Sequence, residues 1–531
     1  MAELIRLKEM ASVVLRGGFK SKSVTLTCNG VLRMATLART SADDGFVPVS
    51  WDNARPYEEI PGPKPLPIIG NLHQFIPGIG VMGDNNLIEQ QRNLFKKYGK
   101  IAKLTNIPGR RDMVFLFDPK LFEEMYRQEG PWPDRDGLHS IAYYRKVHRK
   151  DFFEGIGGLL IEFGEEWKKF RTKVNPPMMQ PTIANKYLRP ILEVSNDFIE
   201  RLKLIRDSKG EMPEDFINEL NKWALESIAT IALDKRLGCL EPNLPPDSET
   251  QRMIDSAQSL ITCLDVLELR PPLWKMISTP NWKKLVNALD YFTEVAMKYI
   301  NDAIKRMQER KPDDDYEPSV LEKLLLRDSN PKTACVMALD MLAAGVDTTS
   351  FTTASMLYNL SKNQDKQQLL FEEIKKFLPN KNDPITVEMV EEMKYLKACI
   401  KESMRTLGIV VVNLRGTPKD IVIGNYRIPK NVNVMMPHFI TGLMDEHYPL
   451  AKQFIPERWL KNRPGENGLI GSPEDFDQVN GFKTNPFVFM PFGFGQRMCI
   501  GRRFVQLEMT TLMIKVKIVC FLSMRKHIAI I

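Results

Sequence analysis

The sequence predicts a mainly α-helical protein with small β-sheets, folded as a single large domain. Long segments with apolar residues at helical spacing far outnumber the alternating or β-branched stretches. Hydrophobic residues make up 43% of the 531 residues, which is enough for a large buried core. Residues 60–500 contain no Gly/Ser linker, low-complexity tract or fixed-period repeat, so one domain is favoured although length alone allows more.

The elements of this fold follow a stiff entry segment. Four prolines within residues 61–67 exclude a helix there and favour an extended chain. Apolar periodicity predicts helices over residues 84–98, 183–206, 213–234, 249–266, 283–309, 332–361, 363–378 and 386–407. Strand-like patterns are fewer and cover residues 100–105, 112–117, 409–414 and 421–435.

The N-terminus has the composition of a mitochondrial transit peptide. Residues 1–40 carry seven basic residues against two acidic ones, with frequent serine and threonine. We therefore expect a transit peptide over residues 1–45 and the folded domain over residues 46–531, with a disordered basic tail as the alternative. No apolar run of about 18 residues occurs, so the sequence predicts no transmembrane anchor.

Charge and cysteine content exclude other classes of function. Lysine and arginine number 74 against 66 acidic residues, and this net charge of +8 is mild and unclustered. We therefore expect no nucleic-acid partner. The seven cysteines are odd in number and widely spaced, which predicts neither a zinc site nor a disulfide framework and favours a reducing compartment.

The most informative motif is a glycine-rich loop at residues 491–501 that contains Cys499. Gly493 and Gly495 allow a tight bend and a close approach to a flat ligand, and Gly501 leaves room against the ligand's face. A helical pattern begins at about residue 501, so the cysteine lies near a helix N-terminus, where free N–H groups stabilise a thiolate. Taken alone, a cysteine in such a turn is more often structural.

From Phe492 to Gly501 this loop resembles the haem-binding loop of the cytochrome P-450 superfamily, Phe-x-x-Gly-x-Arg-x-Cys-x-Gly, at every named position. The resemblance implies the cytochrome P-450 fold and haem b as cofactor. It also implies that Cys499 is the axial ligand of the haem iron, where a thiolate favours O–O cleavage. Arg497 is placed to pair with a carboxylate of the ligand.

A second motif lies in the predicted helix at residues 332–361. Small residues at 343–345 leave space beside that helix, and Gly345 weakens it locally. Thr348 is able to turn its hydroxyl back to the carbonyl of Ala344 and open the helical ladder, and Asp347 beside it is able to exchange protons with solvent. An ordinary packing face is the alternative. The segment resembles the oxygen-activating helix of the family, which implies that Asp347 and Thr348 deliver protons.

Two further motifs stand in the order that the family requires. Glu402 and Arg405 share one helix face, and Arg458 follows about fifty residues later. They resemble the family's Glu-x-x-Arg pair and the arginine of its buried triad, which implies a structural role. Trp167 and Arg171 resemble the Trp-x-x-x-Arg motif that contacts the haem propionates. Including the proline-rich entry, the resemblance covers about residues 56–515.

Several basic residues resemble the mitochondrial branch of the family, and the segment from Arg55 to Pro63 most resembles its insect members. The resemblance implies mitochondrial localisation on the matrix side of the inner membrane. It also implies electron supply from an adrenodoxin-type ferredoxin and its NADPH-dependent reductase. The residues implied for ferredoxin docking are Lys397, Lys401, Arg502 and Arg503.

Apolar and basic residues mix in residues 268–285, which predicts peripheral contact with a membrane: Leu273, Trp274, Lys275, Met276, Ile277, Trp282, Lys283 and Lys284. A packed loop between helices is the alternative. The segments expected to line the substrate pocket are residues 131–160, 261–266, 337–345 and 409–414, which are mostly apolar. They favour a lipophilic substrate that is steroid-like or a xenobiotic.

The sequence departs from the family pattern in two places. Gly408 replaces the proline expected after the Glu-x-x-Arg motif, and 32 residues follow Cys499 (531 − 499), fewer than the family's C-terminal strand pair needs. We expect those strands to be missing or altered, at a cost in stability or activity. The leading hypothesis is a monooxygenase. A haem-thiolate isomerase or dehydratase and an inactive, C-terminally truncated product remain alternatives.

Overall fold

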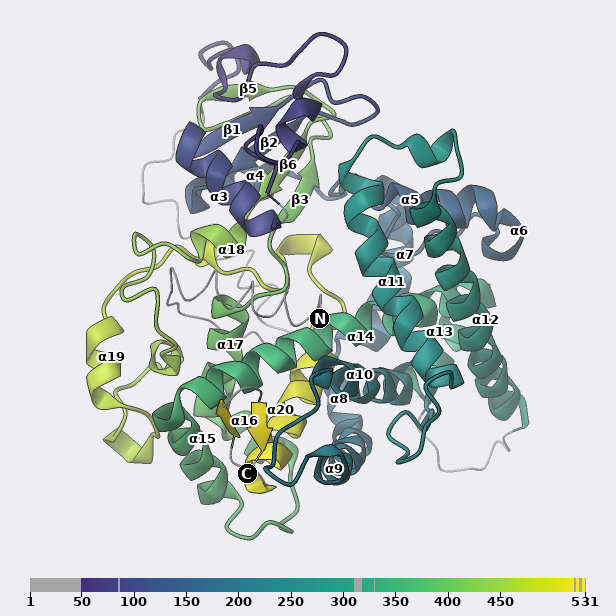
Figure 1. Cartoon of the computed structure of the whole chain (residues 1–531), viewed down its shortest axis with the longest axis vertical. Helices are drawn as coiled ribbons and strands as arrows, with labels where there is room; N and C mark the ends of the chain where they lie inside the picture. The colour runs from purple at the N-terminus through teal and green to yellow at the C-terminus, as the bar shows by residue number, and fades with distance from the viewer. Residues whose placement is uncertain are drawn as a thin grey trace.

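Helix α14 (Pro331–Lys362) runs through the middle of the protein (Figure 1). The computed structural model describes residues 49–84, 86–309, 318–328, 330–519, 522–524 and 528–530. Pro331 is favoured at the first helical position, and the Asn330 side chain caps the helix by accepting the N–H of Lys332 at 2.9 Å. Helix α14 packs against α10 (Phe216–Leu233), α17 (Lys394–Thr406) and α20 (Arg502–Val519).

The other helices precede and follow α14 in the sequence. Before α14 come α3 (Leu87–Tyr98), α4 (Pro119–Gln128), α5 (His139–Tyr143), the π-helical turn η3 (Tyr144–His148), α6 (Lys150–Phe153), α7 (Gly164–Met179), α8 (Pro181–Lys186), α9 (Leu188–Ile205), α11 (Glu249–Leu269), α12 (Pro280–Glu309) and α13 (Val320–Arg327). After it come α15 (Gln364–Phe377), α16 (Val387–Glu392), α18 (His438–Thr441) and α19 (Pro473–Val479). The 3₁₀ turns are η1 (Tyr57–Glu59), η2 (Asn71–Phe75), η4 (Leu273–Lys275), η5 (Pro456–Trp459), η6 (Glu466–Gly468), η7 (Pro486–Val488) and η8 (Gly495–Arg497).

A four-stranded sheet lies at one end of the molecule, beside the helical part (Figure 1). Its order is β1 (Ile101–Leu104), β2 (Met113–Leu116), β6 (Asn433–Met436), β3 (Asn413–Gly416); the central pair is parallel and the outer pairs are antiparallel. The hairpin β4 (Ile421–Ile423) and β5 (Tyr426–Ile428) turns at Gly424 and Asn425, whose positive φ angles suit a two-residue turn. Strands β7 (Leu522–Met524) and β8 (Ile528–Ile530) pair after α20, and β7 lies beside α14.

Two large hydrophobic clusters meet at α14. Residues 334–346 of this helix belong to one cluster, and residues 354–360 belong to the other. The segment between them, residues 347–353, is polar except for Phe351. The centre of α14 is therefore mostly polar, whereas the segments on both sides of it pack in the hydrophobic clusters.

Gly345 lies at a close approach between α14 and α10. A Cβ atom at this position would stand 2.7 Å from Cγ1 of Ile228, so the helices need glycine to pack at this distance. Of the described helices, α14 alone is long and apolar enough to cross a membrane, but 78% of its most apolar window is buried inside the protein. Helix α14 thus has the burial of a core helix.

The predicted fold class of a mainly α protein with small sheets is confirmed. Four local predictions differ from the structure. The predicted helix at 386–407 is interrupted at Met393, and the one at 183–206 is two helices, α8 and α9. The predicted strand segment at 421–435 is three strands in two sheets. The C-terminal strands were expected to be missing or altered, and the structure has one short antiparallel pair there, β7 and β8. The predicted transit peptide lies outside the described residues.

Candidate functional site

The loop that carries Cys499 is closed by its own backbone. The N–H of Cys499 donates to the carbonyl of Phe492 at 2.8 Å. Gly493 and Gly495 have φ angles of 70° and 68°, a left-handed conformation that glycine adopts at little cost. A Cβ atom on Gly495 would also stand 2.7 Å from Oε1 of Glu129. Both glycines are therefore required by the turn itself, as the sequence predicted.

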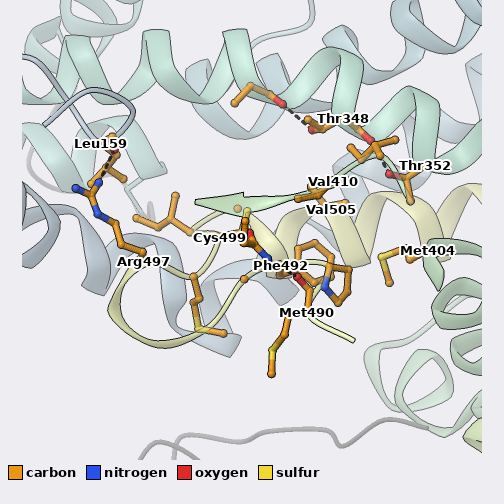
Figure 2. Close-up of a pocket in the computed structure, with 18 of the residues that line it drawn as sticks. Leu159, Thr348, Thr352, Met404, Val410, Met490, Phe492, Arg497, Cys499 and Val505 are labelled. Carbon is orange, nitrogen blue, oxygen red and sulfur yellow. Dashed lines mark hydrogen bonds between the residues drawn. The ribbon is translucent and has the colours of Figure 1, made fainter. Parts of the chain in front are cut away.

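The thiol of Cys499 is exposed into an internal cavity of about 360 Å³ (Figure 2). Helix α20 begins three residues later at Arg502, so the backbone N–H groups of Gly501 and Arg502 act on the sulfur from the helix N-terminus. Burial raises the pKa of the Cys499 thiol, while these N–H groups and Arg171 oppose the rise. Among the described atoms outside the neighbouring residues, only the Cys499 sulfur lies within 4 Å of a Cβ atom placed on Gly501. The space beside Gly501 is therefore open.

Helix α14 forms the opposite wall of the cavity, and Figure 2 shows Thr348 and Thr352 on it, across the cavity from Cys499. The hydroxyl of Thr348 donates to the carbonyl of Ala344 at 2.6 Å, as predicted. Helix α14 nevertheless remains an unbroken α-helix through this point, so the expected opening of the ladder is not present. Asp347 points elsewhere: its side chain is buried and is not part of the cavity lining.

Trp167 and Arg171 of α7 stand beside the Cys499 loop. Both line the cavity, and Arg171 donates to the carbonyl of Met498 at 2.9 Å. The guanidinium of Arg497 lies 4.2 Å from the centre of the Trp167 ring and donates to three backbone carbonyls, those of Pro133, Leu159 and Glu162. Burial lowers the pKa of Arg497 to about 8 and that of Arg171 to about 10.

The ionisable cavity residues that the sequence analysis did not name individually include Arg135, Arg415 and His438, and of these Arg135 lies within the predicted pocket segment 131–160. Arg415 forms a buried ion pair with Glu129, and it also donates to the carbonyl of Phe494 in the Cys499 loop at 3.2 Å. Burial lowers the pKa of His438 to about 3, so its ring stays neutral at physiological pH. Arg135 lies in a loop, Arg415 in strand β3 and His438 in helix α18. None of them belongs to a local sequence motif that would have identified it.

Glu402 and Arg405 form a buried bidentate pair on α17. The Glu402 carboxylate accepts from Nε and Nη2 of Arg405 at 2.9 and 2.8 Å, and also from the Ile455 N–H and the Trp459 indole at 3.0 and 3.1 Å. Arg458 is farther away, with its Nε 3.9 Å from Glu402. The pair therefore ties α17 to η5, and the ring of Trp459 in turn lies 5.0 Å from that of Phe489, just ahead of the Cys499 loop.

The predicted docking residues only partly form one patch. Burial lowers the pKa of Lys401 to about 8, and the nearby charges of Lys397, Arg502 and Lys461 add to this effect. Its ammonium lies 5.4 Å from the centre of the Trp459 ring. Arg503, in contrast, donates to the carbonyl of Met179 at the end of α7.

The predicted pocket segments are confirmed in three of four cases. The lining includes residues from 131–160, 337–345 and 409–414, but none from 261–266. The apolar side chains of the lining include Leu159, Leu160, Ile228, Met337, Met341 and Val410.

Comparisons with known proteins match this arrangement. The family model described as Cytochrome P-450 matches residues 60–516. The chain belongs to the cytochrome P-450 family. It is 41% identical over 466 residues to probable cytochrome P-450 301a1, mitochondrial, of Drosophila melanogaster, covering 88% of this chain and 82% of that protein. It is 40% identical to probable cytochrome P-450 12a5, mitochondrial, of the same fly (86% and 84%) and 38% identical to cytochrome P-450 CYP12A2 of Musca domestica (86% and 84%).

The chain is therefore a haem-thiolate monooxygenase with haem b as its cofactor. The cavity of this cytochrome P-450 fits that group on three observations. The Cys499 thiol opens into the cavity, and the buried Nε of Arg171 has no hydrogen-bond partner among the described residues. Of the five arginines that line the cavity, Arg405 and Arg415 are paired with Glu402 and Glu129. The other three, Arg135, Arg171 and Arg497, donate to backbone carbonyls, so their charges would favour an anionic ligand.

Proposed function

We propose that Cys499 is the axial ligand of the haem and that the enzyme inserts one oxygen atom of O2 into a lipophilic small molecule, steroid-like or a xenobiotic. The observation that carries the assignment is the thiol of Cys499 opening into a mostly apolar cavity. When bound, the haem supplies the redox chemistry of RH + O2 + two electrons + two protons giving ROH + H2O. Arg171, with its uncommitted Nε, and Arg135 are placed to receive the haem carboxylates.

Thr348 is the residue that we assign to proton handling in the cavity. Its hydroxyl lies on the α14 wall and donates to the Ala344 carbonyl at 2.6 Å, while Thr352, one turn later on the same wall, donates to the Thr348 carbonyl at 2.7 Å. Asp347 lies on the same helix, but its side chain is buried and does not line the cavity. Any contribution of Asp347 to proton transfer would therefore be made from within α14. A relay from Asp347 through the polar segment 347–353 is consistent with the position of both residues.

We expect Thr348→Ala to keep haem and substrate binding while the yield of product per NADPH consumed falls roughly tenfold or more, because the proton donor in the cavity wall is lost. Reducing equivalents should appear as hydrogen peroxide, which is measured beside NADPH and product. Thr353→Ala is the matched control, because Thr353 also bonds back along α14, to Thr349, but does not line the cavity. Equal yields from Thr348→Ala and the parent would remove Thr348 from this role.

We propose that electrons come from an adrenodoxin-type ferredoxin in the mitochondrial matrix, with its NADPH-dependent reductase. Relatives named mitochondrial support the compartment, and the basic composition of residues 1–45 agrees with import. Lys397, Lys401, Lys461 and Arg502 gather on one surface, and a basic patch speeds encounter with an acidic partner. Of these residues, Arg502 is next to the Cys499 loop, because its guanidinium lies 6.0 Å from the centre of the Phe492 ring.

Lys397→Gln combined with Lys401→Gln should slow haem reduction by ferredoxin about tenfold at low salt, because the steering charge is lost. Stopped-flow reduction measures this, and the difference should shrink as salt rises. Above pH 8 the parent should also slow, since Lys401 loses its proton near its lowered pKa of about 8. Lys96→Gln with Lys97→Gln removes the same charge from α3 and should change nothing. A docking site elsewhere is indicated if both double variants are reduced at the parental rate.

We propose that the connection between α11 and α12 touches the surface of the inner membrane, although the sequence-based prediction was wrong for two of its residues. Trp274 and Trp282 are buried: their rings stack at 4.9 Å, and both meet the edge of Tyr143. Leu273, Met276 and Ile277 are exposed by 61%, 86% and 71%. The segment before β1 contains a second group of exposed apolar residues: Leu66, Ile68, Ile76 and Ile79.

Replacing Leu273, Met276 and Ile277 with serine should weaken binding to anionic liposomes by about tenfold or more, because three apolar side chains no longer enter the interface. Flotation or co-sedimentation measures this, and the melting temperature should stay constant because all three side chains are exposed. Leu204→Ser with Leu326→Ser is the control, since these exposed leucines lie elsewhere. Unchanged liposome binding by the triple variant would favour an ordinary surface loop.

A further inference from the structure

Residues 157–162, here called the strap, form a short irregular segment between α6 and α7 that covers one side of the cavity. Leu159 and Leu160 of the strap line the cavity, and Figure 2 shows Leu159 beside Arg497. The strap contains no helix or strand, so its backbone groups must find partners elsewhere. The described partners are mainly charged side chains from distant parts of the chain.

On the Cys499 side, arginines hold the strap by its carbonyl groups. Arg497 donates to the carbonyls of Leu159 and Glu162 at 3.3 and 2.6 Å. Arg135 donates to the carbonyl of Leu160 at 3.0 Å. The strap is therefore bonded directly to the loop that carries the proposed iron ligand.

On the α14 side, the strap is held by a buried ion pair. Asp340 of α14 accepts the N–H of Leu159 at 3.0 Å with one carboxylate oxygen and the guanidinium of Arg145 at 2.7 Å with the other. Arg145, in the π-helical turn η3, also donates to the carbonyl of Gly157 at 2.6 Å. Both charged side chains are at least 95% buried.

The fit between Asp340 and the strap is close. Gly158 has a φ angle of 81°, and a Cβ atom there would stand 2.6 Å from the carboxylate of Asp340. Glu162 closes the strap by accepting the N–H of Gly157 at 3.0 Å and pairing with Lys146 at 2.8 Å. Leu159 is thus bonded to α14 through its N–H and to the Cys499 loop through its carbonyl.

A buried ion pair is a poor source of stability, because the cost of desolvating two charges is often as large as their attraction. Replacing such a pair by apolar residues of similar volume is often neutral or even stabilising. The presence of this ion pair is explained better by the two hydrogen bonds that it makes with the strap, from the Leu159 N–H to Asp340 and from Arg145 to the Gly157 carbonyl. Asp340 also lies on the cavity face of α14 that carries Thr348, so the pair fixes the position of the strap relative to that helix.

We propose that Asp340 and Arg145 are positioning residues that fix the strap, and thereby determine which bulky molecules fit in the cavity between Leu159, Leu160 and α14. The proposal depends on the family membership of the chain and not on the electron donor, compartment or membrane contact proposed above. It assigns part of substrate selection to an ion pair that acts by holding the strap in place.

The test compares two haem ligands by optical titration of the holoenzyme. Imidazole needs only the iron, whereas 4-phenylimidazole also needs space along the cavity wall. Asp340→Asn keeps an oxygen for the Leu159 N–H but breaks the ion pair. Asp340→Leu with Arg145→Met removes both charges and so avoids leaving one of them buried alone. Asp290→Asn is the matched control, because Asp290 pairs with Arg149 at 2.6 Å at the end of the same turn but does not contact the strap.

We expect the double variant to hold a parental haem content and to shift the ratio of the two dissociation constants about tenfold, the equivalent of one charge-assisted hydrogen bond. Asp340→Asn should shift the ratio less, because it keeps one contact. Hydrogen exchange of peptides covering residues 157–162 should accelerate in both variants. An unchanged ratio, unchanged exchange or an equal shift in Asp290→Asn would overturn the proposal.

Discussion

Cys499→Ser should abolish the absorption band at about 450 nm that the reduced, carbon monoxide-treated parent shows, because only a thiolate ligand gives the iron that electronic character. A serine hydroxyl has nearly the same size, so the loop should still close through the bond between the N–H of residue 499 and the carbonyl of Phe492. Activity should fall to background in the same preparation. The measurement is a difference spectrum with haem content determined independently.

The control for this experiment is another cysteine of the same chain. Cys335→Ser changes a buried thiol on α14 that lies outside the cavity lining. It should leave the 450 nm band in place, with at most a modest loss of stability. Persistence of the band in Cys499→Ser would mean that a different residue binds the iron.

Glu402→Gln should lower the free energy of unfolding by about 3–5 kcal/mol and reduce the haem content of the purified protein, because it leaves the charge of Arg405 buried without its carboxylate. The carboxylate accepts four hydrogen bonds, and an amide cannot accept all of them. Burial already raises the pKa of Glu402 to about 7 against the effect of Arg405, so this charge is held at a cost. Urea denaturation and the haem-to-protein ratio measure the two effects.

Asp477→Asn is the surface counterpart of that variant. Arg463 binds Asp477 through two nitrogens, as Arg405 binds Glu402, but both side chains are about half exposed. Its loss should change the free energy of unfolding by less than about 1 kcal/mol. Similar losses from the two variants would show that the Glu402 pair stabilises the protein no more than a surface pair does.

Local patterns in the sequence predicted one side of the site well. Cys499, Thr348 and the Glu402–Arg405 pair belong to short motifs, and the hydrogen bond within each motif joins residues three to seven positions apart. The bonds from Glu402 to Ile455 and Trp459 are long-range and were not predicted. The bond from Thr348 to the Ala344 carbonyl was predicted because helical spacing alone brings those atoms together. Residues at such short separations are positioned by secondary structure.

The rest of the site depends on contacts between distant segments, which a single sequence does not reveal. Arg145 and Asp340 are 195 residues apart, and Arg415 and Glu129 are 286 apart. Neither pair has a spacing that distinguishes it from surface charges. Trp274 and Trp282 show the same limit, because an apolar and basic composition predicts an interface but not which side chains turn inward to meet Tyr143.

The way the strap is anchored bears on how this enzyme acquires new specificities. Arg135, Arg145 and Arg497 hold it through main-chain carbonyls, which every amino acid possesses. The side chains at positions 159 and 160 therefore take no part in these hydrogen bonds, and changing them leaves the bonds in place. Mutations there would alter the shape of the cavity while leaving its frame intact, so we expect lineages of this enzyme to diverge in substrate at these two positions sooner than at the charged residues that hold them.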